Sequence, residues 1–204
     1  TCINGMQLNF LMDWCFSTDE LILEDPETKT KYFPQKMGSE RIKNTHAFTQ
    51  VLSDGPDCDE TEIKEMLRHL ILNSKSHIYL TTPYLIPSDD VLNDLKLAAY
   101  SGVDVRIVIP DVPDKKLVYI CSESYIEPLL TAGIRIYKMK EHFIHSKLYV
   151  FDDSVSMFGT VNFDMRSFFL NFEQNVIQFH DKDLNREMTT TIYELLNRSE
   201  EIYL

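Results

Sequence analysis

From about residue 46 onward, short apolar runs alternate with longer amphipathic stretches. The apolar runs have the length and residue types of β-strands, and turn residues bound most of them. They lie in "HAFTQVLSDGP", "HIYLTTPYLIP", "VDVRIVIP", "IRIYKM", "KLYVFDD" and "EQNVIQFH". The continuous apolar centre of "VDVRIVIP" predicts a strand that is buried on both faces.

The stretches between these runs carry apolar residues at helical spacing. One helix is predicted after Asp59, which forms a candidate capping box with Glu62, and a second after Ser88 as its cap. A third is expected over about residues 114–132, and a closing helix after the cap Asp181. Strands that alternate with helices predict the α/β class, with a mixed, largely parallel β-sheet flanked by helices on both faces.

Residues 1–45 do not share this pattern. Residues 1–23 are predicted to form an amphipathic helix, because apolar residues recur at helical spacing. These are Leu8, Leu11, Met12 and Cys15. Residues 24–45 are polar and contain two prolines and one glycine, which is typical of a linker or a long loop. We therefore expect a regular domain over residues 46–204, preceded by a segment that belongs to another unit.

The charge balance narrows the range of partners. Of 204 residues, 20 are Lys or Arg and 32 are Asp or Glu, which gives a net charge of −12. A broad nucleic-acid-binding surface needs clustered cations, so no nucleic-acid partner is expected, although one small basic pocket for a phosphate is compatible with this charge. The apolar content of 44% supports a sizeable core. No apolar run approaches the roughly 18 residues of a transmembrane helix, so the chain as given is expected to be soluble.

The candidate chemistry lies in "HFIHSKLYVFDDSVSMFGTVNFDMRS", residues 142–167. Side chains alternate along a strand, so His145 and Lys147 share one face, while Leu148 and Val150 take the other and can anchor the strand in the core. A histidine beside a lysine suits a phosphodiester, because the lysine supplies positive charge and the imidazole can act as a nucleophile or as a proton donor.

A second group of polar residues follows this pair. Gly159 lets the backbone approach closely, and Thr160 and Asn162 share a face and offer neutral donors to phosphate oxygens. Such donors stabilise the charge that develops on those oxygens in the transition state. Glu173, on the next predicted strand, could accept from the Nδ1–H of His145 and so leave Nε2 free to react.

Several of these residues also have purely structural interpretations. His145 alone is compatible with a surface or core histidine, and Asp152 with a turn. His142 and His145 face opposite sides of a strand, so they are not expected to bind a metal together. Tyr84 either lines a pocket or packs in the core, and Arg166 either binds a phosphate or braces its loop.

The full pattern is more specific than its parts. H-x-K-x4-D-x6-G-T-x-N resembles the signature of the phospholipase D superfamily, and it comprises His145, Lys147, Asp152, Gly159, Thr160 and Asn162. "YLTTPYLIPSDDVLNDLKLAAYSGVDVRIVIP" and "GTVNFDMRSFFLNFEQN" resemble bacterial cardiolipin synthases over nearly the whole chain, least over residues 24–45. Two positions depart from the common pattern, Ser146 where Ala is frequent and Phe163 where Met is frequent, and neither is expected to affect the site.

The resemblance implies a reaction. Members of this superfamily build one active site from two such motifs, without a metal or other cofactor. One histidine attacks phosphorus to give a phosphohistidine, and the other protonates the leaving alcohol. For cardiolipin synthases, two phosphatidylglycerol molecules give cardiolipin and glycerol. This chain has one complete motif, so it resembles the C-terminal catalytic half of such an enzyme, with the N-terminal catalytic half as its partner.

The resemblance also implies roles for single residues. By analogy with two-motif members, His145 is expected to be the general acid and base, while the other half supplies the nucleophile. The catalytic set is His145, Lys147, Asp152 and Glu173, and the phosphate-binding set is Lys147, Thr160 and Asn162. Within these sets, Asp152 is expected to support the site and Glu173 to orient His145.

Other functions remain open at this point. The motif also occurs in homodimeric nucleases and in phospholipid hydrolases, and an inactive interaction module is a third alternative. The acidic balance argues against a nuclease, whereas the motif does not distinguish transfer to an alcohol from hydrolysis. The resemblance places the full-length enzyme at the bacterial cell membrane, held by segments absent here, with chemistry on the cytoplasmic side. The isolated fragment is expected to be soluble and inactive.

Overall fold

The computed structural model describes residues 2–20, 22–24, 26–33, 47–58, 60–140 and 142–204. The strands are β1 (Phe48–Asp54), β2 (His77–Thr81), β3 (Leu85–Ile86), β4 (Asp104–Pro110), β5 (Arg135–Met139), β6 (Leu148–Phe151), β7 (Val155–Gly159), β8 (Phe163–Asp164), β9 (Glu173–Phe179) and β10 (Ser199–Ile202). The α-helices are α1 (Cys2–Thr18), α2 (Pro26–Tyr32), α3 (Glu62–Asn73), α4 (Asp89–Tyr100), α5 (Lys116–Thr131), α6 (Met165–Phe169) and α7 (Lys182–Asn197). A short 3-10 helix spans Ile22–Glu24.

The main sheet is mixed, as predicted, but it is not largely parallel. Its eight strands have the order β1-β9-β7-β6-β2-β4-β5-β10. Only the β2–β4 and β4–β5 pairs of this sheet are parallel. The pairs β1–β9, β9–β7, β7–β6, β6–β2 and β5–β10 are antiparallel. The prediction is wrong because β6 and β7 form a tight hairpin, whereas parallel neighbours need a long crossover.

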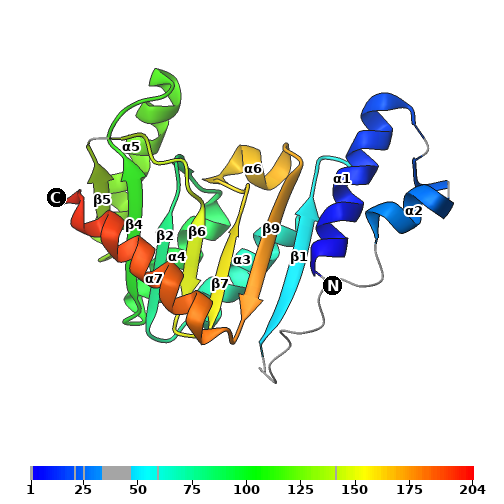
Figure 1. The fold of residues 1–204 in the computed structure, drawn as a ribbon. Coiled ribbons are helices and arrows are strands. Elements are labelled where there is room, and N and C mark those ends of the chain that lie inside the picture. The colour runs from blue at the N-terminus through cyan, green and yellow to red at the C-terminus, as the bar shows by residue number, and fades with distance from the viewer. Residues whose placement is uncertain (1, 21, 25, 34–46, 59, 141) are drawn as a thin grey trace.

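Helices cover both faces of the sheet, as the α/β pattern predicts (Figure 1). On one face, α3, α4 and α5 bury the larger apolar cluster, which includes Leu67, Leu95, Leu129 and Ile107. On the other face, α7 crosses the strands and buries a smaller cluster, which includes Ile192 and Val150. Burial on two faces explains why the central strand β4 has a continuous apolar run.

The N-terminal helix α1 lies beside the edge strand β1 (Figure 1). It is helical as predicted, but its apolar residues do not form one face that is buried against the sheet. Leu11 is buried, while Leu8 and Met12 are 42% and 56% exposed. Although α1 is rich in apolar residues, none of the helices described is long and apolar enough to cross a membrane. The expected linker contains the short helix α2, and residues 34–45 of it lie outside the described part.

The predicted helix caps are formed in part. The Oδ1 atom of Asp181 accepts from two backbone N–H groups at the start of α7, as predicted. Asp59 lies outside the described residues, and at the start of α3 the Ile63 N–H donates to Oδ2 of Asp54 at 3.3 Å. Ser88 occupies the cap position of α4, but its hydroxyl donates to the Asp90 side chain instead of accepting a backbone N–H.

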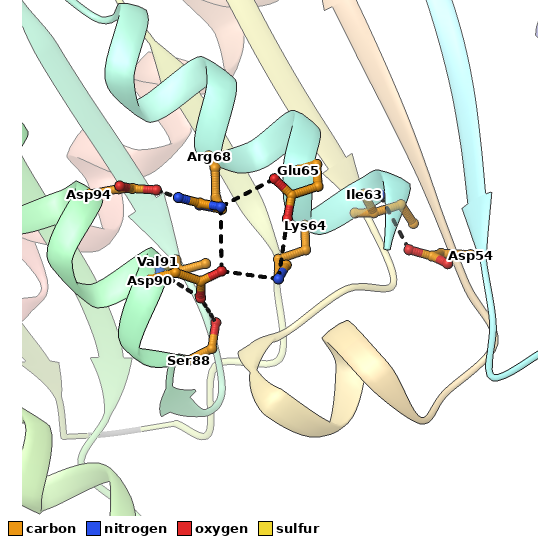
Figure 2. Close-up of polar contacts among 9 residues, drawn as sticks. All are labelled: Asp54, Ile63, Lys64, Glu65, Arg68, Ser88, Asp90, Val91 and Asp94. Carbon is orange, nitrogen blue, oxygen red and sulfur yellow. Dashed lines mark hydrogen bonds and ion pairs between the residues drawn. The ribbon is translucent and has the colours of Figure 1, made fainter. Parts of the chain in front are cut away.

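A network of partly buried charges joins α3 to α4 (Figure 2). Lys64 Nζ lies 3.0 Å from Asp90 and 3.2 Å from Glu65. Arg68 Nε lies 2.6 Å from Asp94, and its Nη1 lies 3.5 Å from Asp90. Asp90 is therefore shared by two cations, which fixes the two helices relative to each other.

Candidate active site

The motif residues come together because several strands end at one edge of the sheet. Leu148, the first residue of β6, pairs with Thr81, the last residue of β2. Gly159, the last residue of β7, pairs with Asn175 near the start of β9. The turn before β6 and the turn after β7 therefore lie next to each other, and these two turns carry His145 and the residues after Gly159. They enclose an open hollow lined by His145, Ser146, Lys147, Leu148, Phe158, Gly159 and Thr160.

His145 and Lys147 are in direct contact. Lys147 Nζ donates to the carbonyl oxygen of His145 at 2.8 Å and lies 3.1 Å from its Nδ1 and 3.3 Å from its Nε2. His145 is exposed, whereas Lys147 is 8% exposed. The Phe143 ring lies beside the imidazole, with the two ring centroids 6.0 Å apart. An accessible imidazole is thus held against a buried cation.

Two buried carboxylates face this cation. Burial lowers the pKa of Lys147, and the negative charges of Glu173 and Asp164 oppose that effect. Glu173 and Asp164 are 8% and 6% exposed. Burial also raises the pKa of Asp164, against the Ser167 N–H that donates to its Oδ1 at 2.7 Å. Lys147 therefore supplies positive charge at the base of the hollow.

Asp164 was missed in the sequence analysis. It is the N-cap of α6, and the sequence signal was an aspartate directly before a short run that ends in two phenylalanines. Because its side chain is committed to this cap, Asp164 ties the position of α6 to the base of the hollow.

Gly159 and Thr160 are held against β9. A Cβ atom on Gly159 would lie 2.2 Å from the carbonyl oxygen of Gln174, so the close backbone approach predicted for this glycine is present. Thr160 Oγ1 accepts from the Gln174 N–H at 2.9 Å, and the Thr160 N–H donates to the Gln174 carbonyl at 3.0 Å. Asn175, also missed in the sequence analysis, is fully buried and its Oδ1 accepts from the Val161 N–H at 3.2 Å.

Asn162 is positioned by Ser167 of α6. Its backbone N–H and its Nδ2 both donate to Ser167 Oγ, at 3.2 Å and 3.1 Å. An amide Nδ2 carries two hydrogens, and a second side-chain hydrogen bond, from Asn162 to Asp164, helps to lower the pKa of that carboxyl. Oδ1 of Asn162 is buried and has no hydrogen-bond partner among the described residues.

Glu173 does not contact His145 as the sequence analysis expected. Its Oε1 accepts from Asn171 Nδ2 at 3.0 Å, and the described contacts include no hydrogen bond between Glu173 and His145. The reason is that Lys147 Nζ occupies the space beside Nδ1 of the imidazole. Glu173 acts instead on the charge of Lys147.

Asp152 lies at the opposite end of β6 from His145 and does not line the hollow. Its carboxylate accepts from the backbone N–H groups of Lys75, Ser76 and His77 at 2.9, 2.8 and 2.9 Å. Burial would raise its pKa, but these three donors hold the pKa below its usual value. Asp152 therefore fixes the β6–β7 turn against the start of β2.

A second H-x-K tripeptide, His180 to Lys182, lies outside the site. It forms the turn between β9 and α7, and β9 starts at the site edge, so this turn is at the far edge of the sheet. It is not followed by the rest of the pattern, since position 187 is Glu and no G-T-x-N follows.

Three further residues named in the sequence analysis have definite contacts. Ser146 Oγ lies 2.9 Å from Thr81 Oγ1, so Ser146 ties the His145 turn to β2. Tyr84 lines a cavity, and its hydroxyl donates to Asp114 at 2.7 Å; burial and this contact raise the pKa of Tyr84 to about 12. Arg166 Nε donates to Asn171 Oδ1 at 3.2 Å, which braces the loop after α6.

Solved structures of other proteins share this fold. The phospholipase D family member Nuc from Salmonella typhimurium gives a TM-score of 0.66 at 21% identity, over 78% of this chain and 99% of that chain. A phosphatidylserine synthase from Haemophilus influenzae gives 0.64 at 14% identity, over 76% of this chain and 40% of that chain. Fold and motif together define the phospholipase D class of α/β domains.

Sequence relatives define the family more narrowly. Residues 67–196 match a family described as "Cardiolipin synthase, PLD-like domain". Cardiolipin synthase 2 of Bacillus cereus is 37% identical over 202 residues, which cover 98% of this chain and 37% of the relative. Cardiolipin synthase of Halalkalibacterium halodurans is 37% identical over 193 residues, again 37% of its length. The chain belongs to the phospholipase D-like domain family of cardiolipin synthases, and it spans about a third of the length of these relatives.

Proposed function

We propose that this chain is the C-terminal catalytic half of a phosphatidyl transferase that joins two phosphatidylglycerol molecules into cardiolipin with release of glycerol. The observation that supports it is the exposed imidazole of His145 held against the buried cation Lys147, next to Thr160, in a chain of the cardiolipin synthase family. Residues 1–45 would belong to the preceding catalytic half, which supplies the second histidine.

In this proposal, His145 moves a proton in each of two steps. First, the histidine of the other half attacks phosphorus, the bond between phosphorus and the glycerol head-group oxygen breaks, and protonated His145 donates its proton to that oxygen. Neutral His145 then accepts the proton of a hydroxyl group on the second phosphatidylglycerol. That oxygen attacks phosphorus, and the phosphorus–nitrogen bond breaks. Both histidines are thereby restored.

The other site residues stabilise the phosphate. Lys147 provides positive charge, and the Thr160 hydroxyl and the Asn162 Nδ2 group provide neutral donors by turning from their present partners, the Gln174 carbonyl and the Asp164 carboxylate. Glu173 and Asp164 act as positioning residues, because they face Lys147 rather than the substrate. Asp152 supports the turn at the far end of the strand.

A matched pair of histidines tests the proposal in the complete two-motif enzyme. His145→Ala is expected to lower turnover of phosphatidylglycerol vesicles in EDTA by roughly 10²–10⁴-fold, the typical effect of removing an acid–base group. His142→Ala, three positions away and exposed, is the control and should keep normal turnover. Near-normal activity of His145→Ala would contradict the proposal.

A second substrate shows whether His145 acts as the general acid or as the nucleophile. Phosphatidyl p-nitrophenol has a leaving group that needs no proton, so His145→Ala should still release one burst of p-nitrophenol from it. If His145 were the nucleophile, no burst would form.

Mass spectrometry of the products identifies the acceptor: cardiolipin supports the transferase, whereas phosphatidic acid would make the protein a hydrolase. Cleavage of DNA in EDTA would indicate a nuclease instead.

A further inference from the structure

A second cavity reaches Asn162 between β3, the start of α5 and the helix α6. Its volume is about 560 Å³, which falls in the range of roughly 300–1,000 Å³ found for ligand pockets. Most of its lining surface is apolar, and five apolar side chains contribute to it: Ile86, Val118, Met165, Phe169 and Leu170. A cavity with mainly apolar walls that ends at a phosphate-binding residue suits a ligand with a phosphate at one end and an apolar body.

Positive charge also gathers at this cavity. Lys115 and Arg166 line it, and neither forms an ion pair with another residue of the described ranges. Asp164 is the acidic member of the lining, and its Oδ1 already accepts from Ser167. In a chain with a net charge of −12, two unpaired cations beside one cavity favour an anionic ligand.

The apolar wall is also more exposed than a folded domain requires. Met165, Phe169 and Leu170 are 48%, 40% and 66% exposed. α6 is nevertheless fixed, because Lys64 Nζ lies 4.9 Å from the centre of the Phe169 ring and Asp164 caps the helix. Exposed apolar side chains on a fixed helix are typical of a surface that contacts an apolar partner.

We infer that this cavity binds the diacylglycerol part of an anionic glycerophospholipid. One acyl chain would lie along Val118, Met165 and Phe169, with the ester end toward Asn162 and with Lys115 and Arg166 facing the negative head groups. The inference rests on the proposed function, since it takes the phosphate to lie at Lys147, Thr160 and Asn162.

Methyl NMR of this chain tests the cavity and the phosphate site separately. Met165 reports on the cavity and Thr160 on the hollow that His145 lines. Two ligands are compared: dihexanoyl phosphatidylglycerol below its critical micelle concentration, and glycerophosphoglycerol, which has the same head group without acyl chains. The diacyl lipid is expected to shift both methyl signals, and glycerophosphoglycerol only that of Thr160.

A variant that fills the cavity gives the affinity test. Val118→Trp is expected to weaken binding of the diacyl lipid about tenfold, because the displaced chain loses burial of several methylene groups. It should leave binding of glycerophosphoglycerol unchanged. Leu97→Trp, at a position on α4 that is 54% exposed and outside the cavity lining, is the matched control.

Dihexanoyl phosphatidylcholine should bind more weakly than the anionic lipid. Equal binding of the two lipids would contradict the role of Lys115 and Arg166 in attracting an anionic head group.

The results distinguish a failure of the cavity inference from a failure of the proposed phosphate site. If Thr160 responds to both ligands and Met165 to neither, the cavity inference is overturned and the proposed phosphate site stands. If neither methyl responds to either ligand, both the cavity inference and the phosphate site of the proposed function are contradicted. A shift at Met165 that Val118→Trp does not weaken would place the lipid elsewhere and overturn the inference.

Discussion

At the residue scale, Gly159 is the position where a side chain is most clearly excluded from the site. A Cβ atom there would lie 2.2 Å from the Gln174 carbonyl oxygen and 2.4 Å from Asn175 Oδ1. We expect Gly159→Ala to lower the free energy of unfolding by about 1–3 kcal/mol, because the hydrogen-bonded β7–β9 pair must move to make room. Urea denaturation followed by circular dichroism measures this change.

Gly5→Ala is the matched control for that substitution. Gly5 lies inside α1, and the nearest atom to an added Cβ would be Val51 Cβ at 3.9 Å. Alanine is favoured over glycine within a helix by about 1 kcal/mol, so this variant should be as stable as the original protein or more stable. Equal destabilisation of the two variants would show that the tight contact at Gly159 does not cause the loss of stability in Gly159→Ala.

Single-residue predictions held where they depended on local geometry. His145 and Lys147 lie together, as their spacing of two residues predicts, although both precede β6 instead of lying in it. The expected contact of Glu173 with His145 depended on distant parts of the chain, and the described hydrogen bonds instead pair Glu173 with Asn171 and His145 with Lys147. Asn175 could not be found from the sequence, because its role depends on a contact that only the fold creates. Its Oδ1 accepts a hydrogen bond from the Val161 N–H.

At the scale of elements, β6 is fixed at both ends by different chemistry. Its first end carries the His145 turn, which Ser146 ties to Thr81 of β2. Its other end is held by Asp152, whose carboxylate accepts three backbone N–H groups at the start of β2. The spacing of five residues from Lys147 to Asp152 therefore corresponds to the length of β6, with the two residues at opposite ends of the strand.

The same scale explains which elements could be predicted. Strands and helices with a sustained apolar period, such as β4, α3 and α7, were found from the sequence. β8, α6 and β3 are each five residues or fewer, too short to show a period. The direction of β6 and β7 was missed because the turn between them holds an Asp152 with a positive φ of 51°, which no apolar pattern encodes.

The charge network between α3 and α4 predicts an acid dependence of stability. Burial would raise the pKa of Asp90, but the Ser88 hydroxyl, Lys64 and the Val91 N–H lower it from 3.8 to about 2. A depressed folded pKa gives stability that is present above the unfolded value and is lost as pH falls through the folded value. The stability difference between the original protein and Asp90→Asn should therefore be constant above about pH 5 and shrink toward pH 2.

The expected size of this change is about 1–2 kcal/mol, after allowance for solvent screening of a partly exposed carboxylate. Urea denaturation at pH 2 to 7 measures it. Lys64→Met is the control background, since Asp90→Asn should have a smaller effect once the cation that faces it is removed (Figure 2). A difference between the original protein and Asp90→Asn that does not vary with pH would contradict the assignment.

At the scale of the whole molecule, the exposed site is open on one side. The hollow beside His145 is open to solvent, and His145 is exposed while Lys147 is buried. A phosphate bound there would be covered by protein on one side, yet the proposed reaction needs a second histidine on the opposite side of phosphorus. The fold class and motif could be read from this one chain, whereas the missing side could be inferred only from the chemistry.

That open side predicts how activity depends on concentration. This chain alone should form no cardiolipin from phosphatidylglycerol vesicles in EDTA. Adding the N-terminal catalytic half as a separate chain should restore turnover, and the rate should saturate as that half is added, because each site needs one copy of each half. An N-terminal half whose motif histidine is replaced by alanine is the control and should restore nothing. If this chain alone is active, and its specific activity rises with its own concentration, then two copies complete the site and the proposed partner is wrong.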